Sequence, residues 1–317
     1  MRVVFLVFLV FTSLFAKDEL LKKAQELEDM GNYKEAMSIY KSIALKESEA
    51  KDSFLDKKEE FVAKHIPIKD EQTKKSLKQI ATSDFGLYPY EKNYFSPFSF
   101  SDTKDRDRKK SEAVFQISFK KPVFYNFFGL DESIEFAYTQ KSFWQIYKHS
   151  LPFRETNYSP ELYVSFLHKD SPLKAYKFGF LHNSNGRGGV ESRTWNRLYA
   201  KAIFMVGDIF LTPTLWYKLH EKGDYKTHED NPDILKYYGY GDLLITYPYK
   251  KHIFELLLRD NLRKKNKGYA KLSWTHPISD ALENYFWYVD SSYGYGDSLI
   301  DYNRKLFRFT FGVAFSR

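Results

Sequence analysis

The residues best suited to chemistry lie between His182 and Asn196, where an imidazole, a hydroxyl and an amide occur close together. His182 and Ser184 are two positions apart, so on a β-strand their side chains project from the same face. If the glycine-rich segment that follows folds back, antiparallel pairing brings Asn196 close to His182. A base, a nucleophile and an orienting group would then meet on one surface patch, as hydrolysis by an activated serine requires.

The flanking residues indicate which face of the strands carries these groups. On both sides of the glycine-rich segment, alternate residues are apolar and lie on the same strand face as His182, Ser184 and Asn196. The residues between them are mostly polar and lie on the other face. That apolar face consists of Tyr176, Phe178, Phe180, Leu198, Ala200, Ala202 and Phe204. In a membrane β-barrel, with lipid outside and water inside, the candidate site would therefore face lipid.

The composition also favours a transmembrane β-barrel. Aromatic residues make up 19% of the chain and charged residues 28%, and no stretch after residue 16 is apolar and long enough to predict a transmembrane helix. Short alternating runs recur instead, as in Phe309, Phe311, Val313 and Phe315. A soluble all-β sandwich has the same period, but inward-facing lysines and glutamates argue against a dry core.

Alternation predicts a closed antiparallel barrel with an even number of strands, as bacterial single-chain barrels have. The basic residues behind the net charge of +8 are dispersed along the chain. This pattern favours attraction to anionic lipid head groups and gives no support for nucleic-acid binding. The twelve predicted strands cover residues 86–99, 112–121, 132–146, 160–168, 173–184, 194–206, 208–217, 235–247, 251–259, 268–276, 281–290 and 305–316.

The N-terminus predicts export from the cytoplasm. Arg2 precedes an apolar run over residues 3–11, and Ala16 ends a segment typical of signal-peptide cleavage. We therefore interpret residues 1–16 as a signal peptide. The chain has no cysteine, which excludes disulfides and a cysteine-linked lipid anchor. An exported, cysteine-free barrel fits the bacterial outer membrane.

Residues 17–83 differ from the rest because they are rich in Lys and Glu and lack alternation. Their apolar positions have helical spacing, interrupted at Gly31 and Asn32, and resemble one tetratricopeptide-type hairpin. We predict a small helical extension and linker in the periplasm, with the barrel domain at 84–317. Three roles remain open for the extension: a solvated helical pair, a dock for a periplasmic partner, or the main functional part with the barrel as its anchor.

From residue 85 onward the chain resembles the outer membrane phospholipase A family. The matching blocks occur in the family's order, and together they are far more specific than any one of them. The resemblance implies a twelve-stranded barrel that hydrolyses the sn-1 and sn-2 acyl esters of phospholipids and lysophospholipids. The blocks are residues 87–90 (Leu-Tyr-Pro-Tyr), 93–94, 138–142, 152–158, 182–187 and 192–197.

The resemblance also implies a role for each candidate site residue. Ser184 would be the nucleophile and His182 its general base, with Asn196 holding the imidazole in the useful tautomer. The main-chain amide of Gly186 would help to stabilise the oxyanion. A neutral amide orients the ring but stabilises the imidazolium less than a carboxylate would.

Calcium and a second subunit are implied in the same way. By position, the calcium ligands would be the Arg187 carbonyl and Ser192 of one subunit, together with Ser150 of the other. Such a site, without a carboxylate, would be weak and well hydrated. Gln140 shares parity with lipid-facing residues, and the resemblance implies that it joins two subunits of an active homodimer.

The alternative interpretation is a non-enzymatic barrel, either a channel or an adhesion protein. Twelve strands leave little space inside a barrel. The predicted inward side chains include Lys177, Lys201, Glu255, Arg259 and Lys271. These features predict a filled lumen and favour the hydrolase.

Overall fold

The computed structural model describes residues 19–43, 86–103, 105, 107–168, 171–219, 230–279, 282 and 284–317. They fall into two compact units, one within residues 1–85 and the other within 86–317. The predicted signal peptide and most of the predicted linker lie outside the described residues.

The first unit contains a helical hairpin. Residues 19–29 and 33–43 are helical, and Gly31 between them has a φ of +81°, a left-handed conformation that glycine adopts without strain. The Asn32 carbonyl accepts hydrogen bonds from the first turn of the second helix, and Ala24 and Ala36 are buried. No helix in the described parts of the chain combines the length and the apolar character needed to cross a membrane.

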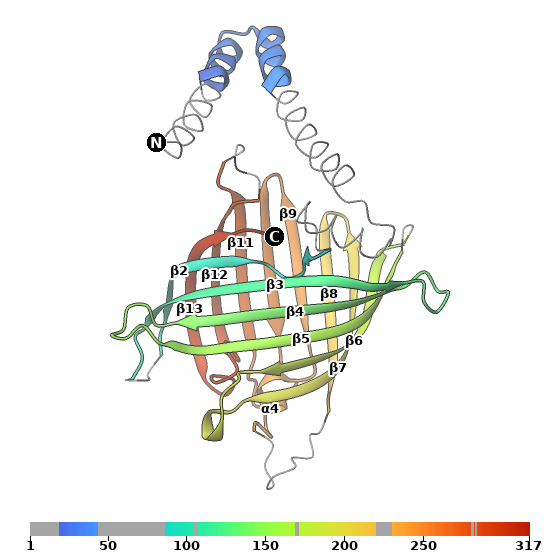
Figure 1. The fold of residues 1–317 in the computed structure, drawn as a ribbon, viewed down its shortest axis with the longest axis vertical. Coiled ribbons are helices and arrows are strands. Elements are labelled where there is room, and N and C mark those ends of the chain that lie inside the picture. Colours follow the sequence, from blue (N-terminus) through green and yellow to red (C-terminus); the bar gives the residue numbers. More distant parts are fainter. Residues whose placement is uncertain are drawn as a thin grey trace, which may run out of the picture. The chain divides into compact units, whose positions relative to one another are not determined.

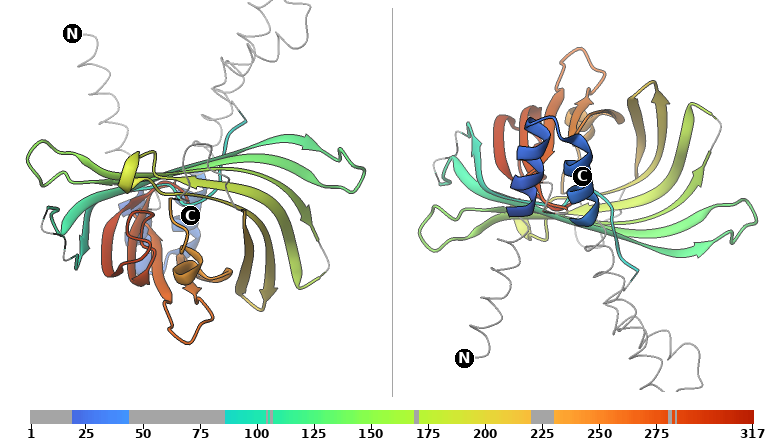
Figure 2. Two further views of the ribbon diagram at one scale, coloured as in Figure 1. Left: turned by 90° about the horizontal axis from the view of Figure 1, so that it is seen from below. Right: turned by 90° about the horizontal axis from the view of Figure 1, so that it is seen from above.

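The second unit is a closed antiparallel barrel of twelve strands, which confirms the predicted fold class (Figure 1). Neighbouring strands pair in chain order, and β13 closes the barrel by pairing with β2. In Figure 2 the sheet curls so that β3 and β4 lie across from the orange and red strands. The strands are β2 (Tyr94–Ser101), β3 (Ser111–Tyr125), β4 (Ser133–Trp144), β5 (Phe153–Leu167), β6 (Leu173–Ser184), β7 (Thr194–Val206), β8 (Ile209–Leu219), β9 (Gly241–Tyr249), β10 (His252–Arg259), β11 (Tyr269–Pro277), β12 (Phe286–Tyr295) and β13 (Lys305–Ala314).

The two ends of the barrel differ in their connections. At one end, which we call the loop end, every connection has at least eight residues: β2–β3, β4–β5, β6–β7, β8–β9, β10–β11 and β12–β13. At the other, the turn end, β7–β8 and β9–β10 are joined by two residues each. The loop between β6 and β7 contains a short 3-10 helix, η1 (Gly189–Glu191).

Four predicted strands were wrong at their starts. The strand expected from residue 160 begins at Phe153 (β5), and the one expected from residue 281 begins at Phe286 (β12). The strand expected at 235–247 begins with a helical turn, α4 (Leu235–Tyr238), at the loop end (Figure 1). Tyr238 is buried against Trp195 inside the barrel, and this packing outweighs local alternation. The strand expected at 86–99 is divided into β1 (Tyr88–Pro89) and β2, because residues 90–93 leave the wall.

A buried network of ion pairs fills the lumen near the loop end. Arg154 donates to both carboxylate oxygens of Glu112 at 3.0 and 3.1 Å, and Arg308 lies 3.0 Å from the same carboxylate. Arg308 also pairs with Asp297 at 2.8 Å, and Arg154 with Asp301 at 3.1 Å. Each charge is paired, as burial requires.

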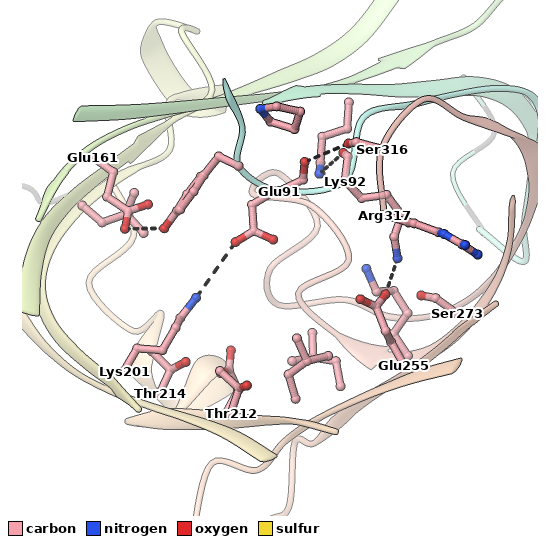
Figure 3. A pocket seen from close by; sticks show the side chains of 18 of the residues that line it. Glu91, Lys92, Glu161, Lys201, Thr212, Thr214, Glu255, Ser273, Ser316 and Arg317 are labelled. Carbon is pink, nitrogen blue, oxygen red and sulfur yellow. Dashed lines mark hydrogen bonds and ion pairs between the residues drawn. The ribbon is translucent and has the colours of Figure 1, made fainter. Parts of the chain in front are cut away.

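The segment over residues 90–93, which we call the strap, crosses the lumen near the turn end. The Tyr90 hydroxyl donates to Glu161 at 2.8 Å, Glu91 lies 4.0 Å from Lys201, and Lys92 forms an ion pair with Glu255. A cavity of about 450 Å³ adjoins these residues (Figure 3). The inward lysines and glutamates expected from alternation therefore do line the lumen.

Candidate functional site

His182 and Asn196 face each other on neighbouring strands. The register of β6 and β7 pairs the two residues directly, and His182 Nδ1 lies 2.7 Å from Asn196 Oδ1. An amide oxygen only accepts hydrogen bonds, so the contact places a proton on Nδ1 and leaves Nε2 of a neutral ring as the basic nitrogen. This is the proximity expected from alternation and a folded-back loop.

Ser184 ends β6 on the same outward face. Its strand partners are Tyr158 on β5 and Thr194 on β7. In the part of the chain that the structure describes, no hydrogen bond joins Ser184 to His182. Hydrogen bonds of this kind are often long without substrate and shorten once it binds.

The loop after Ser184 depends on a glycine at position 186. Gly186 has a φ of +63°, and a Cβ added to it would lie 2.8 Å from the Tyr158 ring. Both the left-handed backbone and the close ring therefore exclude a side chain. Among the described residues, none accepts a hydrogen bond from the Gly186 amide, and the residue is exposed. Its N–H is available to an outside acceptor beside Ser184.

Asn185 holds this loop in place and was not among the predicted site residues. Its side chain is 4% exposed. The side-chain oxygen accepts from the Arg187 amide at 3.2 Å and from the Arg193 amide at 3.0 Å, while Nδ2 donates to the Glu191 carbonyl at 2.8 Å. One buried amide thus ties together both sides of the loop. Its place in the resembling block at 182–187, next to the predicted nucleophile, was the sequence signal for it.

The two candidate calcium ligands in this loop lie near other polar groups. The Arg187 side chain pairs with Glu191 at 2.7 Å and also donates to the Arg154 carbonyl at the start of β5. The Ser192 hydroxyl donates to the carboxylate of Asp230, a residue that the sequence interpretation did not consider. Within the described residues, no group of three or more His, Cys, Asp or Glu side chains is arranged to hold a metal.

Ser150 lies in another loop at the same end, between β4 and β5. It has a φ of +68°, and its hydroxyl lies 3.0 Å from His149 Nδ1 at the exposed surface. Ser150 therefore lies in a different loop from Arg187 and Ser192. A ligand role shared with them would require contributions from two loops or from two subunits.

Gln140 lies on β4, level with Ser184 on the outward face. Gln140 pairs with Tyr158, and Tyr158 pairs with Ser184, so two strand spacings of about 10 Å separate Gln140 from Ser184. The Tyr138 hydroxyl donates to Gln140 at 3.0 Å, and Gln140 donates to Ser142 at 3.3 Å. With respect to the residues that the structure describes, the side-chain amide retains one N–H and one oxygen lone pair for a further partner.

Comparison with known proteins agrees with this architecture. Residues 70–315 match the family model described as Phospholipase A1. A putative phospholipase A1 of Neisseria meningitidis is 36% identical over 219 residues, which are 66% of this chain and 56% of that protein. This chain therefore spans little more than half the length of that relative.

Solved structures of outer membrane phospholipases also resemble the chain. Outer membrane phospholipase A of Escherichia coli matches with a TM-score of 0.66 and 32% identity, covering 73% of this chain and 92% of that one. The same values hold for its asparagine-to-alanine active-site mutant. A Salmonella typhi outer membrane phospholipase, described as a dimer with bound calcium, has a TM-score of 0.67 at the same identity and coverage. The chain therefore belongs to the phospholipase A1 family of outer-membrane β-barrels.

Proposed function

We propose that the chain is a calcium-dependent outer-membrane phospholipase that hydrolyses the sn-1 and sn-2 acyl esters of phospholipids and lysophospholipids. The observation that carries the proposal is the 2.7 Å contact between His182 and Asn196 beside Ser184 on the outward face of the barrel. A hydrolytic site turned towards lipid suits a substrate that is itself a membrane component. The active-site asparagine of the Escherichia coli protein supports the assignment of Asn196.

The chemistry follows from the hydrogen-bonding capacity of each residue. His182 Nε2 removes the Ser184 proton as the oxygen attacks the ester carbonyl, and the Gly186 N–H donates to the resulting oxyanion. The carbon–oxygen bond to glycerol then breaks, and the imidazolium gives its proton to the departing oxygen. Water, deprotonated by His182, cleaves the acyl–serine ester, releasing the fatty acid and restoring the serine hydroxyl. Asn196 accepts from Nδ1–H throughout and keeps Nε2 directed at the reaction.

The donor chemistry near Ser184 fits a calcium ion. The Arg187 carbonyl, the Ser192 hydroxyl and the Asp230 carboxylate supply only oxygen, which hard cations prefer. Arg187 and Ser192 of one subunit and Ser150 of the other would hold the ion, which would supply positive charge near the oxyanion. The Salmonella typhi relative, described as a dimer with bound calcium, supports a role for calcium and for a homodimer.

The remaining assignments concern location and assembly. With the turn end in the periplasm, the loop end and the site lie at the outer leaflet, and residues 17–83 form a periplasmic extension available to a partner there. Gln140 would lie in the dimer interface. Signal peptide cleavage after residue 16 is part of the same proposal.

Fatty-acid release from phospholipid mixed micelles by the purified full chain tests this function. We expect Ser184→Ala to lower the rate at least about 10³-fold and a calcium chelator to abolish turnover reversibly. Ser165→Ala, which removes a hydroxyl that donates to Glu135 in the lumen, serves as the matched control and should retain activity. Equal rates for wild type and Ser184→Ala would refute the proposal, while turnover unaffected by chelation would refute its calcium component.

A further inference from the structure

Two histidines and a tryptophan form a cluster on the outward face of β10 and β11, at the turn end of the barrel. His252 begins β10, and Trp274 and His276 lie near the end of β11. They share strand parity with Phe254 on β10 and Leu272 on β11, which are 37% and 53% exposed, so their side chains point away from the lumen. The centres of the two imidazole rings are 4.4 Å apart. The cluster therefore lies where the barrel wall meets lipid head groups.

Hydrogen bonds determine which nitrogen of each ring carries the proton. Trp274 Nε1–H donates to His252 Nδ1 at 3.0 Å, so the proton of a neutral His252 ring is on Nε2. His276 Nδ1 lies 2.7 Å from the Pro277 carbonyl oxygen, which only accepts, so a neutral His276 has its proton on Nδ1 and a lone pair on Nε2. Among the residues that the structure describes, neither Nε2 atom takes part in a hydrogen bond. The cluster thus presents one donor and one acceptor side by side.

This pair of tautomers does not suit a metal ion. Two neighbouring imidazoles chelate a transition metal only when each directs a lone pair at it. His252 carries a proton on Nε2, and its lone pair on Nδ1 already accepts from Trp274. The cluster instead suits an organic ligand that offers an acceptor to His252 and a donor to His276.

Lys250 adds a positive charge next to His252. Lys250 and Lys251 form the two-residue turn between β9 and β10, and Lys250 is exposed, with Nζ 5.5 Å from the centre of the Tyr249 ring. Tyr249 pairs with His252 across this turn. A negatively charged acceptor is therefore favoured at His252 Nε2. At the boundary between lipid and water, that acceptor is the phosphate of a lipid head group.

From these observations we propose that His252, His276 and Lys250 bind the head group of a phospholipid in the leaflet at the turn end, with phosphoethanolamine preferred. The phosphate accepts from His252 Nε2–H and from Lys250, and the ammonium group, two methylene units along, donates to His276 Nε2. Phosphocholine offers the same phosphate but has no N–H, so it leaves His276 without a donor. The source is a membrane lipid because Phe254 and Leu272 continue the same face as apolar wall. This lipid is bound without being hydrolysed, since β8 and β9 separate it from β7 and the candidate catalytic site is at the opposite end.

Native mass spectrometry of the full chain in detergent tests the site, with dioleoyl phosphatidylethanolamine and dioleoyl phosphatidylcholine at equal concentration. The Ser184→Ala protein serves as the parent, so that neither lipid is hydrolysed. The parent should retain phosphatidylethanolamine about tenfold more than phosphatidylcholine, because one hydrogen bond from a charged donor is gained. His276→Phe should bring this ratio to about one, and His276→Gln, which keeps an acceptor, should retain part of the preference. His168→Phe is the matched control, since His168 is an exposed histidine between β5 and β6, and it should leave the ratio unchanged.

Equal retention of the two lipids by the parent would overturn the inference. A preference that survives in His276→Phe would also overturn it, as would an equal loss of both lipids in that variant, because His276 would then act as an imidazolium donor to the phosphate. Near-ultraviolet circular dichroism reports whether each variant is folded, and His276→Gln replaces the phenylalanine variant where that one is not. Failure of the proposed function is a separate result, because it would appear as equal fatty-acid release by wild type and Ser184→Ala, whichever lipid the cluster binds.

Discussion

The lumen and the outward face of this barrel use polar residues in opposite ways. Inside, Arg154, Arg308, Glu112 and Asp297 are nearly inaccessible and pair with one another. Outside, His182, Ser184 and Asn196 are uncharged or weakly basic and partly exposed. The inner charges form ion pairs with one another, whereas the Ser184 hydroxyl and the Gly186 amide have no hydrogen-bond partner among the described residues and are available to a substrate. Ion pairing in the lumen compensates the buried charges, whereas available donors and acceptors at the surface permit chemistry.

The largest expected effect on the lumen side comes from Arg308→Met. The change leaves the carboxylates of Glu112 and Asp297 buried with fewer partners, which costs about 3–5 kcal/mol in the free energy of unfolding. Urea unfolding of the barrel in detergent micelles measures the loss, and activity per folded molecule should stay within about twofold of wild type. A stable Arg308→Met protein with little activity would contradict the division between lumen and outer face.

Asn196→Ala should have the converse effect to Arg308→Met: activity should fall while stability is nearly unchanged. Without the acceptor at Nδ1, the imidazole loses its tautomer and orientation, and kcat should fall about 100-fold. The free energy of unfolding should change by no more than about 1 kcal/mol, because Asn196 is only partly buried. Asn196→Asp keeps an acceptor and should retain more activity than the alanine variant, whereas equal activities would argue that orientation is unimportant.

The acid stability of the barrel provides a smaller test of the lumen network. Burial opposes ionisation of Asp297, but Arg308 and Lys141 outweigh it and lower the pKa of Asp297 from 3.8 to about 2. A lowered pKa contributes stability above pH 3.8 that disappears as the pH falls through about 2. Asp297→Asn should therefore flatten the fall in unfolding free energy over this range by about 2 kcal/mol. An identical pH profile in both proteins would show that the pairing contributes nothing.

Gln140→Leu should have the smallest effect. Polar contacts between membrane subunits contribute about 0.6 kcal/mol on average, so the dimer dissociation constant should rise about threefold. Sedimentation equilibrium in detergent measures it, and monomer stability should be unchanged. Ile117→Leu, at the position on β3 that pairs with Gln140, is the control for altered surface packing.

Local sequence patterns were enough to predict much of the candidate site. His182 and Ser184 could be assigned to one face, and Asn196 placed opposite, because strand alternation and antiparallel pairing are short-range rules. Asn185 and Asp230 were missed because their roles depend on contacts across a loop and between loops. Gly186 could be named from the resemblance, but the Tyr158 ring that excludes a side chain there belongs to another strand.

By itself, the sequence determined the barrel class, the strand count and the outward position of the candidate triad, because side-chain period and polarity are properties of neighbouring residues. It also predicted that Lys201 and Glu255 face inward. Only the tertiary structure decided that Glu91 and Lys92 of the strap would meet them, and that Tyr238 would form a helical turn in the lumen. Those outcomes depend on which strands meet across the barrel and on how their side chains share its limited volume, which no local pattern specifies.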